Sequence, residues 1–175
     1  MADCAAARNS LMCNDGREDL SLRCIFLTLA ALVLVAPAYA TTLGVMPIKM
    51  LDTSGEVRDQ SAAHSTRIVA INKALERDLA EQYSKIVMIP AQDVASVCPV
   101  EDPQCLLDIA AAAGADKALF VSIVKTSTLI MRMYVQIVDV PQKAVAQKRE
   151  LNFRGDTDES WQRAERFLVR NLKEP

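Results

Sequence analysis

Histidine is the scarcest of the common catalytic residues in this sequence, with one, His64, among 175 residues. A catalytic triad needs a nucleophile, a base and a group that orients the base. Asp59, Ser61 and Ser65 are too close to His64 in sequence to make a convincing relay. We therefore interpret His64 as a solvated residue near the start of a helix, and the sequence predicts no catalytic residue.

An excess of positive charge is also absent. The chain has 20 basic and 22 acidic residues and a formal net charge of −2. No basic cluster stands out after residue 40, so the phosphate neutralisation that holds nucleic acids is not supported. A polybasic amphipathic helix, typical of membrane-surface binding, is missing as well. The composition therefore predicts no nucleic-acid partner.

Signatures of bound cofactors are equally scarce. The pair Ser54-Gly55 is a weak match to a phosphate-binding loop, because the helix after it lacks the glycine-lysine signature. Thioether sulfurs are suitable Cu(I) ligands, but methionines on predicted strands are better explained as core filling; these are Met46, Met50, Met88, Met131 and Met133. We predict no cofactor and no metal.

The longest apolar run, Ile25 to Val35, is preceded by Arg23 and followed by a small-residue pattern that ends at Ala40. This arrangement predicts a secretory signal peptide that is cleaved after Ala40. The run is about half the roughly 20 residues that span a bilayer as a helix, so a permanent membrane anchor is disfavoured. Lipidation of Cys24 is discounted because this cysteine precedes the run. We expect residues 1–40 to be removed and residues 41–175 to form a single domain in the bacterial periplasm or outside the cell.

After cleavage only Cys98 and Cys105 would remain of the five cysteines. An even pair in an oxidising compartment favours a disulfide. The closure of so short a loop stabilises a protein by about 2–3 kcal/mol in the chain-entropy model. A redox-active or metal-binding pair is the alternative, but the spacing is not Cys-x-x-Cys.

Hydrophobic periodicity predicts an α/β fold. Strands are expected at 42–49, 86–89, 117–126, from 131 onwards, and 144–154, and helices at 62–83 and 106–113. A final helix is marked by Trp161, Ala164, Leu168 and Leu172. The order β-α-β-α-β-β-β-α gives parallel pairs early and antiparallel pairs late. We expect a two-layer sandwich in which helices cover one face of a mixed five-stranded sheet.

Ligands of such sheets often bind beyond the carboxyl ends of parallel strands. This rule makes the loop from Asp52 to Asp59, together with His64, the best candidate for a small-molecule site. An ordinary connecting loop is the favoured interpretation.

The strand that starts at Met131 alternates apolar residues with Arg132, Tyr134 and Gln136, and the next strand carries Lys148. Alternation of this kind predicts one buried and one solvated face. The solvated side mixes an aromatic ring with adaptable polar groups, as protein-contact surfaces do. We therefore regard it as a candidate interaction surface, with a plain solvated face as the alternative.

Over most of residues 41–175, the chain resembles a family of exported bacterial proteins known only as a domain of unknown function. The resemblance rests on the cysteine pair before a helix that ends in Gly114-Ala115-Asp116, and on a C-terminal motif. The motif consists of Gly155, Thr157, Asp158, Glu159, Ser160 and Trp161, followed by Arg170 and Asn171. The cysteines here are further apart than in the family pattern. The resemblance implies no enzymatic activity, and the strand order is similar to that of periplasmic modules such as the N-terminal domain of the Tol-system propeller protein.

The motif also has a purely structural interpretation. Asp156 or Thr157 caps the last helix, Trp161 is buried against the sheet, and Arg170 pairs with an acid or holds the chain end. The alternative is that the acidic group receives a cation or a basic partner. Together these observations favour a non-enzymatic accessory module that binds another envelope protein. A small-ligand binder or weak hydrolase that uses residues 52–59 is the alternative.

Overall fold

The structure is a computed structural model that describes residues 41–172, and the predicted signal peptide with its cleavage after Ala40 lies outside the described residues. The described part confirms an α/β fold with a mixed sheet. Its elements in chain order are β1 (Thr42–Val45), β2 (Lys49–Asp52), α2 (Ser61–Leu79), β3 (Lys85–Met88), α3 (Ala91–Val97), α4 (Pro103–Ala112), β4 (Lys117–Lys125), β5 (Met131–Asp139), β6 (Ala144–Phe153) and α5 (Asp158–Asn171).

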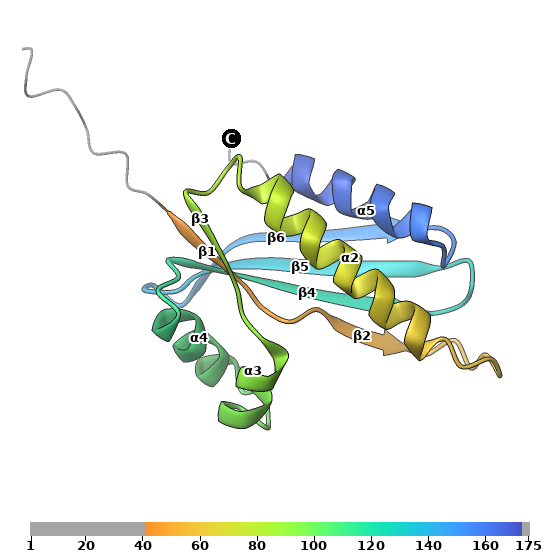
Figure 1. Ribbon diagram of the computed structural model, residues 1–175, viewed down its shortest axis with the longest axis horizontal. Coiled ribbons are helices and arrows are strands. Elements are labelled where there is room, and N and C mark those ends of the chain that lie inside the picture. The colour runs from red at the N-terminus through yellow and green to blue at the C-terminus, as the bar shows by residue number, and fades with distance from the viewer. Residues whose placement is uncertain (1–40, 173–175) are drawn as a thin grey trace, which may run out of the picture. The chain divides into compact units, whose positions relative to one another are not determined.

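The sheet has the order β3-β1-β4-β5-β6, with β2 also paired to β4 (Figure 1). Pairs among β1, β2, β3 and β4 are parallel, whereas β5 and β6 return as an antiparallel meander. The expected change from early parallel to late antiparallel pairing is therefore found. β6 is left as the outer strand on its side of the sheet.

The first expected strand is divided in two, which makes six strands rather than five. β1 pairs with the start of β4 and β2 with its end. Pro47 lies between them and has no backbone N–H to donate to the ladder. The neighbouring Met46 still donates to the Leu119 carbonyl at 2.9 Å. The chain therefore follows β4 along its whole length with a local break at the proline.

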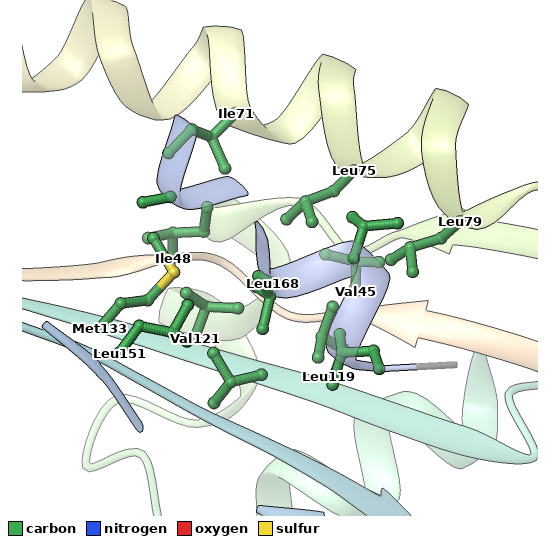
Figure 2. Packing of buried hydrophobic residues seen from close by; sticks show 14 of the residues in the cluster. Val45, Ile48, Ile71, Leu75, Leu79, Leu119, Val121, Met133, Leu151 and Leu168 are labelled. Atoms are coloured by element: carbon green, nitrogen blue, oxygen red, sulfur yellow. The ribbon is translucent and has the colours of Figure 1, made fainter. Parts of the chain in front are cut away.

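α2 and α5 lie side by side on one face of the sheet (Figure 1). The helical spacing of Ile71, Leu75 and Leu79 turns these side chains of α2 toward the sheet, where they meet strand residues such as Val121 (Figure 2). The ring of Trp161 on α5 is 1% exposed and belongs to the same core. Burial of this apolar surface is the main source of stability for the domain.

The other face of the sheet is covered in part by α3 and α4, so the expectation that helices cover only one face is wrong. Leu119 and Val121 on β4 belong to the core under α2 and α5, whereas Ala118 and Phe120 pack with the core under α3 and α4. Successive side chains of a strand point to opposite faces, and this strand is apolar on both. The continuous apolar run therefore needed a second cover, which the short helices provide.

The predicted disulfide between Cys98 and Cys105 is present and connects the end of α3 to the first turn of α4. Its Cα atoms are 6.0 Å apart. α4 begins at Pro103, earlier than expected, because proline is well suited to the first helical position. Asp102 caps this helix by accepting from the backbone N–H groups of Gln104 and Cys105.

Within residues 41–172, none of the helices combines the length and the apolar character that a membrane crossing requires.

Candidate functional site

A buried carboxylate, Asp156, is the centre of the most extensive polar network in the described chain. Its side chain is 3% exposed. Trp161 Nε1 and an Arg67 guanidinium nitrogen donate to Oδ1 at 3.0 and 2.7 Å. His64 Nε2 and Lys125 Nζ lie 2.8 and 3.0 Å from Oδ2. All four neighbours are side chains that approach one carboxylate.

These groups come from segments that are far apart in sequence. His64 and Arg67 lie in the first two turns of α2, Lys125 ends β4, and Trp161 lies in the first turn of α5. The His64 ring is stacked near Trp161 with a centroid distance of 5.9 Å. The Arg67 guanidinium lies 5.9 Å from the centroid of the same ring, which adds a cation–π contact. The network therefore connects both long helices to the end of the central strand.

Two groups of this network, Asp156 and Lys125, are held in their ionised forms. Burial by itself raises the pKa of Asp156, but hydrogen bonds from His64, Lys125 and Trp161 outweigh it, and the pKa is lowered. Burial lowers the pKa of Lys125, but hydrogen bonds to Glu56 and Asp156 outweigh it, and the pKa is raised. An ammonium of this kind is no nucleophile, because nucleophilic lysines need a lowered pKa. The geometry is that of an internal crosslink.

The candidate ligand loop lies at the outer side of this network. Asp52, Asp59 and His64 line one surface cleft of about 400 Å³, so the structure brings the three predicted residues together. Their polar atoms are nevertheless occupied by local partners. Asp52 accepts from both the backbone and the hydroxyl of Ser54, and Asp59 accepts from the backbone N–H of Ser61.

These local hydrogen bonds lower the pKa of both loop carboxylates, so neither is suited to act as a general acid near neutral pH. The expectation that His64 is solvated is wrong, because its side chain is 6% exposed and its Nε2 contacts Asp156. Residues 61–63 of the same helix start are exposed, so the burial of His64 reflects its contact with Asp156 in the segment before α5. Among residues 41–172, no group of three or more histidine, cysteine, aspartate or glutamate side chains is arranged to hold a metal ion.

The methionines are placed as core or partly buried residues. Met46, Met131 and Met133 are at most 2% exposed and belong to the two hydrophobic cores. Met50 and Met88 are partly buried and pack against the larger core.

The C-terminal motif helps to hold Asp156 in the network, while two of its acidic residues, Asp158 and Glu159, remain 79% and 76% exposed. Thr157, not Asp156, caps α5 by accepting from the Ser160 backbone N–H, since the Asp156 carboxylate is directed into the network. Gly155 has a φ of +87°, and a Cβ there would lie 3.1 Å from Ser160 Oγ. Glycine is therefore required both by backbone conformation and by space.

Other motif residues make peripheral contacts. Asp158 accepts from Arg67 Nε at 2.8 Å, and Glu159 lies 3.6 Å from Arg163 one turn further along α5. At the helix end, Asn171 donates to the Phe167 carbonyl at 2.7 Å. Arg170 is exposed in the last turn, where a basic side chain interacts favourably with the helix dipole.

The candidate interaction surface is found on the sheet face that α2 and α5 do not cover. We define the polar sheet face as Arg132, Tyr134 and Gln136 on β5 with Lys148 on β6, which pairs with Gln136. Arg132 and Lys148 are exposed, whereas the tyrosine and the glutamine are half-buried. A hydrogen bond with Tyr134 raises the pKa of the Arg132 guanidinium.

A cleft of about 290 Å³ separates this face from α4. Tyr134, Gln136 and Ser122 are its polar lining residues. The other lining residues are apolar and come from α4 and the sheet, namely Pro103, Leu106, Leu107, Phe120 and Val138. The polar sheet face therefore borders a largely apolar depression through Tyr134 and Gln136. The sequence alone did not indicate this feature, because α4 was expected on the other side of the sheet.

Lys125, Arg67 and Glu56 were not anticipated from the sequence. One signal was available for Lys125. It continues the inward series Leu119, Val121, Ile123 at a spacing of two, which places a charged residue on the buried face. A buried cation requires carboxylate partners, and here they are Glu56 and Asp156, both at 3.0 Å, and Asp52 at 3.6 Å.

Comparison with known proteins gives the following matches. Residues 41–172 match the model of a family named DUF3280 and described as a protein of unknown function (DUF2380). Among curated proteins there is no match.

Three solved structures illustrate the similarity in fold. A neuraminyllactose-binding hemagglutinin homolog from Helicobacter pylori is 9% identical, with a TM-score of 0.52 over 79% of this chain and 86% of that chain. The LpoB C-terminal domain from Salmonella enterica is 14% identical, with a TM-score of 0.41 over 71% of this chain and 92% of that chain. TolB from Acinetobacter baumannii is 15% identical, with a TM-score of 0.45 over 77% of this chain and 27% of that chain. At these identities the likeness concerns the fold alone.

Proposed function

We propose, from the premise that this chain belongs to the DUF3280 family of proteins of unknown function, that its domain is a non-enzymatic module that binds another protein in the cell envelope. The observation that carries the proposal is the apolar cleft between α4 and β5 with the polar sheet face around it. Interfaces gain most of their affinity from a few aromatic and arginine residues around a desolvated centre. Tyr134 and Arg132 supply these residue types, and Leu106 and Phe120 supply the apolar centre.

The chemistry of the buried network supports a binding role over catalysis. Lys125 and Asp156 are ionised partners of each other, and His64 Nε2 is engaged by the same carboxylate. A general base must reach the proton that it removes from a substrate. In this protein Lys125 and His64 Nε2 are both engaged by Asp156, although the His64 side chain also lines the cleft at the 52–59 loop.

An envelope location is supported by two independent features. The apolar run from Ile25 to Val35 with a small-residue site at Ala40 has the pattern of a cleavable export signal. The Cys98–Cys105 disulfide is of a kind that persists in oxidising compartments such as the periplasm. We propose that the protein acts there after cleavage.

Retention from envelope extract tests the binding role. The immobilised protein is compared with a variant that carries Arg132→Glu, Tyr134→Ala and Lys148→Glu, and with a control that carries Lys73→Glu and Glu76→Lys on the exposed side of α2. We expect one protein to be retained by the wild type and by the control but not by the polar sheet face variant. Equal retention by all three would remove this surface from the proposal.

A second candidate function is supported by the cleft at the 52–59 loop. Its lining contains three carboxylates, those of Asp52, Glu56 and Asp59, against one arginine, Arg58. The excess of acidic groups favours a small cationic molecule, which would compete with the local partners of these carboxylates. A thermal-shift screen with small amines tests it, because a ligand that binds only the native state raises the unfolding temperature. The shift should disappear in Asp52→Ala and persist in Lys148→Glu; a shift that is the same in both variants would exclude the loop.

A further inference from the structure

The outer strand β6 has an unpaired edge. β6 lies at the end of the sheet order and pairs with β5 alone. Within residues 41–172, no backbone–backbone hydrogen bond outside that ladder involves the strand, although the Lys148 carbonyl accepts from the Arg149 guanidinium at 2.9 Å. An exposed edge presents a row of free N–H and C=O groups that an extended peptide is able to pair with. At ten residues, β6 is also the longest strand of the described sheet.

A groove of about 580 Å³ runs along this edge. Its lining includes the consecutive residues 150–154 of the chain, so it follows the strand lengthwise rather than lying over one of its faces. The opposite wall is a single stripe of α5, formed by Ser160, Arg163, Ala164 and Phe167 at helical spacing. Figure 1 shows α5 above β6, at the side of the sheet away from β3. A strand edge beside a helix is the geometry with which peptide-recognition domains take up an added strand.

The walls of the groove indicate the chemistry of the peptide. Phe167 is 48% exposed although it is a large apolar side chain. Two arginines line the groove, Arg154 at the strand end and Arg163 on the helix, and the Arg163 side chain is 62% exposed. Glu150 is the one acidic residue in the lining. The groove is therefore basic and partly apolar in a chain whose net charge is −2.

We infer that this groove binds an extended segment of a partner protein, in which acidic and apolar residues alternate, as an added strand on β6. The inference rests on the proposed function and names the peptide class that the module recognises. Five residues of strand span about 17 Å, so the bound segment is about five residues long. In an extended strand, every second side chain points to the same face. A peptide that alternates acidic and apolar residues would therefore direct only one of the two kinds toward α5.

The charged residues of β6 have an ordinary structural explanation, because charged side chains protect an edge strand from uncontrolled pairing. That explanation covers Lys148, Arg149 and Glu150 but not the exposed Phe167, which belongs to the helix. A second copy of this chain is a less suitable occupant. Its own β6 segment carries Lys148, Arg149 and Arg154 but only one acidic residue, Glu150, so it offers no excess of negative charge to a basic groove.

Fluorescence anisotropy with short labelled peptides tests the inference on the purified full chain. The probe is an eight-residue peptide that alternates aspartate and valine, and its control alternates lysine and valine. We expect the acidic peptide to bind and the basic peptide not to bind. The double variant Arg154→Glu with Arg163→Glu should lower the affinity for the acidic peptide by about tenfold or more. The control double variant, Lys73→Glu with Lys85→Glu, should leave this affinity unchanged. Equal loss in both double variants would show charge attraction without a site and would overturn the inference.

Backbone methylation separates strand addition from simple charge pairing. Two further acidic peptides carry N-methyl groups on alternate residues, one on the odd and one on the even positions. Only one set of N–H groups can face β6, so one methylated peptide should lose binding and the other should keep it. Equal binding of both would contradict strand addition. A dimer that forms with increasing protein concentration and is abolished by the Arg154→Glu and Arg163→Glu pair would assign the edge to a second copy, which also overturns the inference.

The outcome for the groove is independent of the outcome for the polar sheet face. If neither peptide binds but the retention experiment still identifies a partner that depends on Tyr134, the groove inference fails and the proposed function remains. If the acidic peptide binds, and the polar sheet face variant still retains the same proteins as the wild type, the groove is the binding site and the role assigned to the polar sheet face is wrong.

Discussion

The ammonium of Lys125 lies 3.0 Å from Oδ2 of Asp156, and the two side chains are 0% and 3% exposed. The residues are the last of β4 and the second before α5, so the pair fastens the start of the final helix to the central strand. Removal of one partner from a buried ion pair leaves an uncompensated charge, which is far more costly than the loss of an exposed pair.

Replacement of the central carboxylate should therefore be severe. We expect Asp156→Ala to lower the free energy of unfolding by about 3 kcal/mol, because the four side chains directed at this carboxylate lose their shared partner. Lys125 keeps two other carboxylates, Glu56 at 3.0 Å and Asp52 at 3.6 Å, which limits the cost. Urea denaturation measures the change. The control is Asp158→Ala, whose side chain is 79% exposed and which should cost less than about 1 kcal/mol. Similar costs for the two variants would show that the network is no crosslink.

The buried carboxyl of Glu165 on α5 predicts a pH-dependent stability. The residue is 1% exposed, its Oε1 has no hydrogen-bond partner, and burial, together with nearby Asp78, raises its pKa from 4.5 to about 7. The native state thus keeps a proton that the unfolded state releases. The stabilising contribution is complete below pH 4.5 and is lost as the pH rises through about 7.

We expect the free energy of unfolding to fall by up to about 3 kcal/mol between about pH 4.5 and pH 8. The lowered pKa values of Asp52 and Asp156 act in the opposite direction, but only below the ordinary value of 3.8, so they do not affect this window. Chemical denaturation across the pH range measures the slope. Glu165→Gln should abolish most of it, and an unchanged slope in that variant would assign the effect to another group.

The Cys98–Cys105 disulfide should stabilise the α3–α4 segment. The cysteines are 7 residues apart, and loss of the crosslink through Cys98→Ser with Cys105→Ser should cost about 2–3 kcal/mol. Thermal unfolding of the variant and of the reduced wild type measures the change. Reduction should have no further effect on the double variant, whereas a lower unfolding temperature of that variant under reducing conditions would point to an effect unrelated to this bond.

Local periodicity explains why much of the fold was predictable. The spacing of Ile71, Leu75 and Leu79 identifies α2, and the alternation from Met131 onwards identifies β5. The side of the sheet on which α4 lies was predicted incorrectly. The run from Ala118 to Val121 is apolar on both faces, so it does not indicate which helix covers which face of the sheet. Periodicity specifies which residues are buried, but not against which neighbour.

The site was harder to predict than the fold. Asp52, Asp59 and His64 do line one cleft, since they are near in sequence and flank one loop. The network around Asp156 was not foreseen, because His64 precedes its partner by 92 residues and no local pattern joins them. Such contacts arise from packing of distant elements, and a single sequence carries little information on them.

The most direct test of the central claim, that the polar sheet face binds an envelope protein, is photocrosslinking in living cells from a photoreactive amino acid at Tyr134. A second probe at Glu76, on the exposed side of α2, is the matched control. We predict one reproducible crosslinked envelope protein from position 134, absent from position 76, and lost when Arg132→Glu and Lys148→Glu are added. The same proteins trapped from both positions, or no crosslinked protein at either, would contradict the claim.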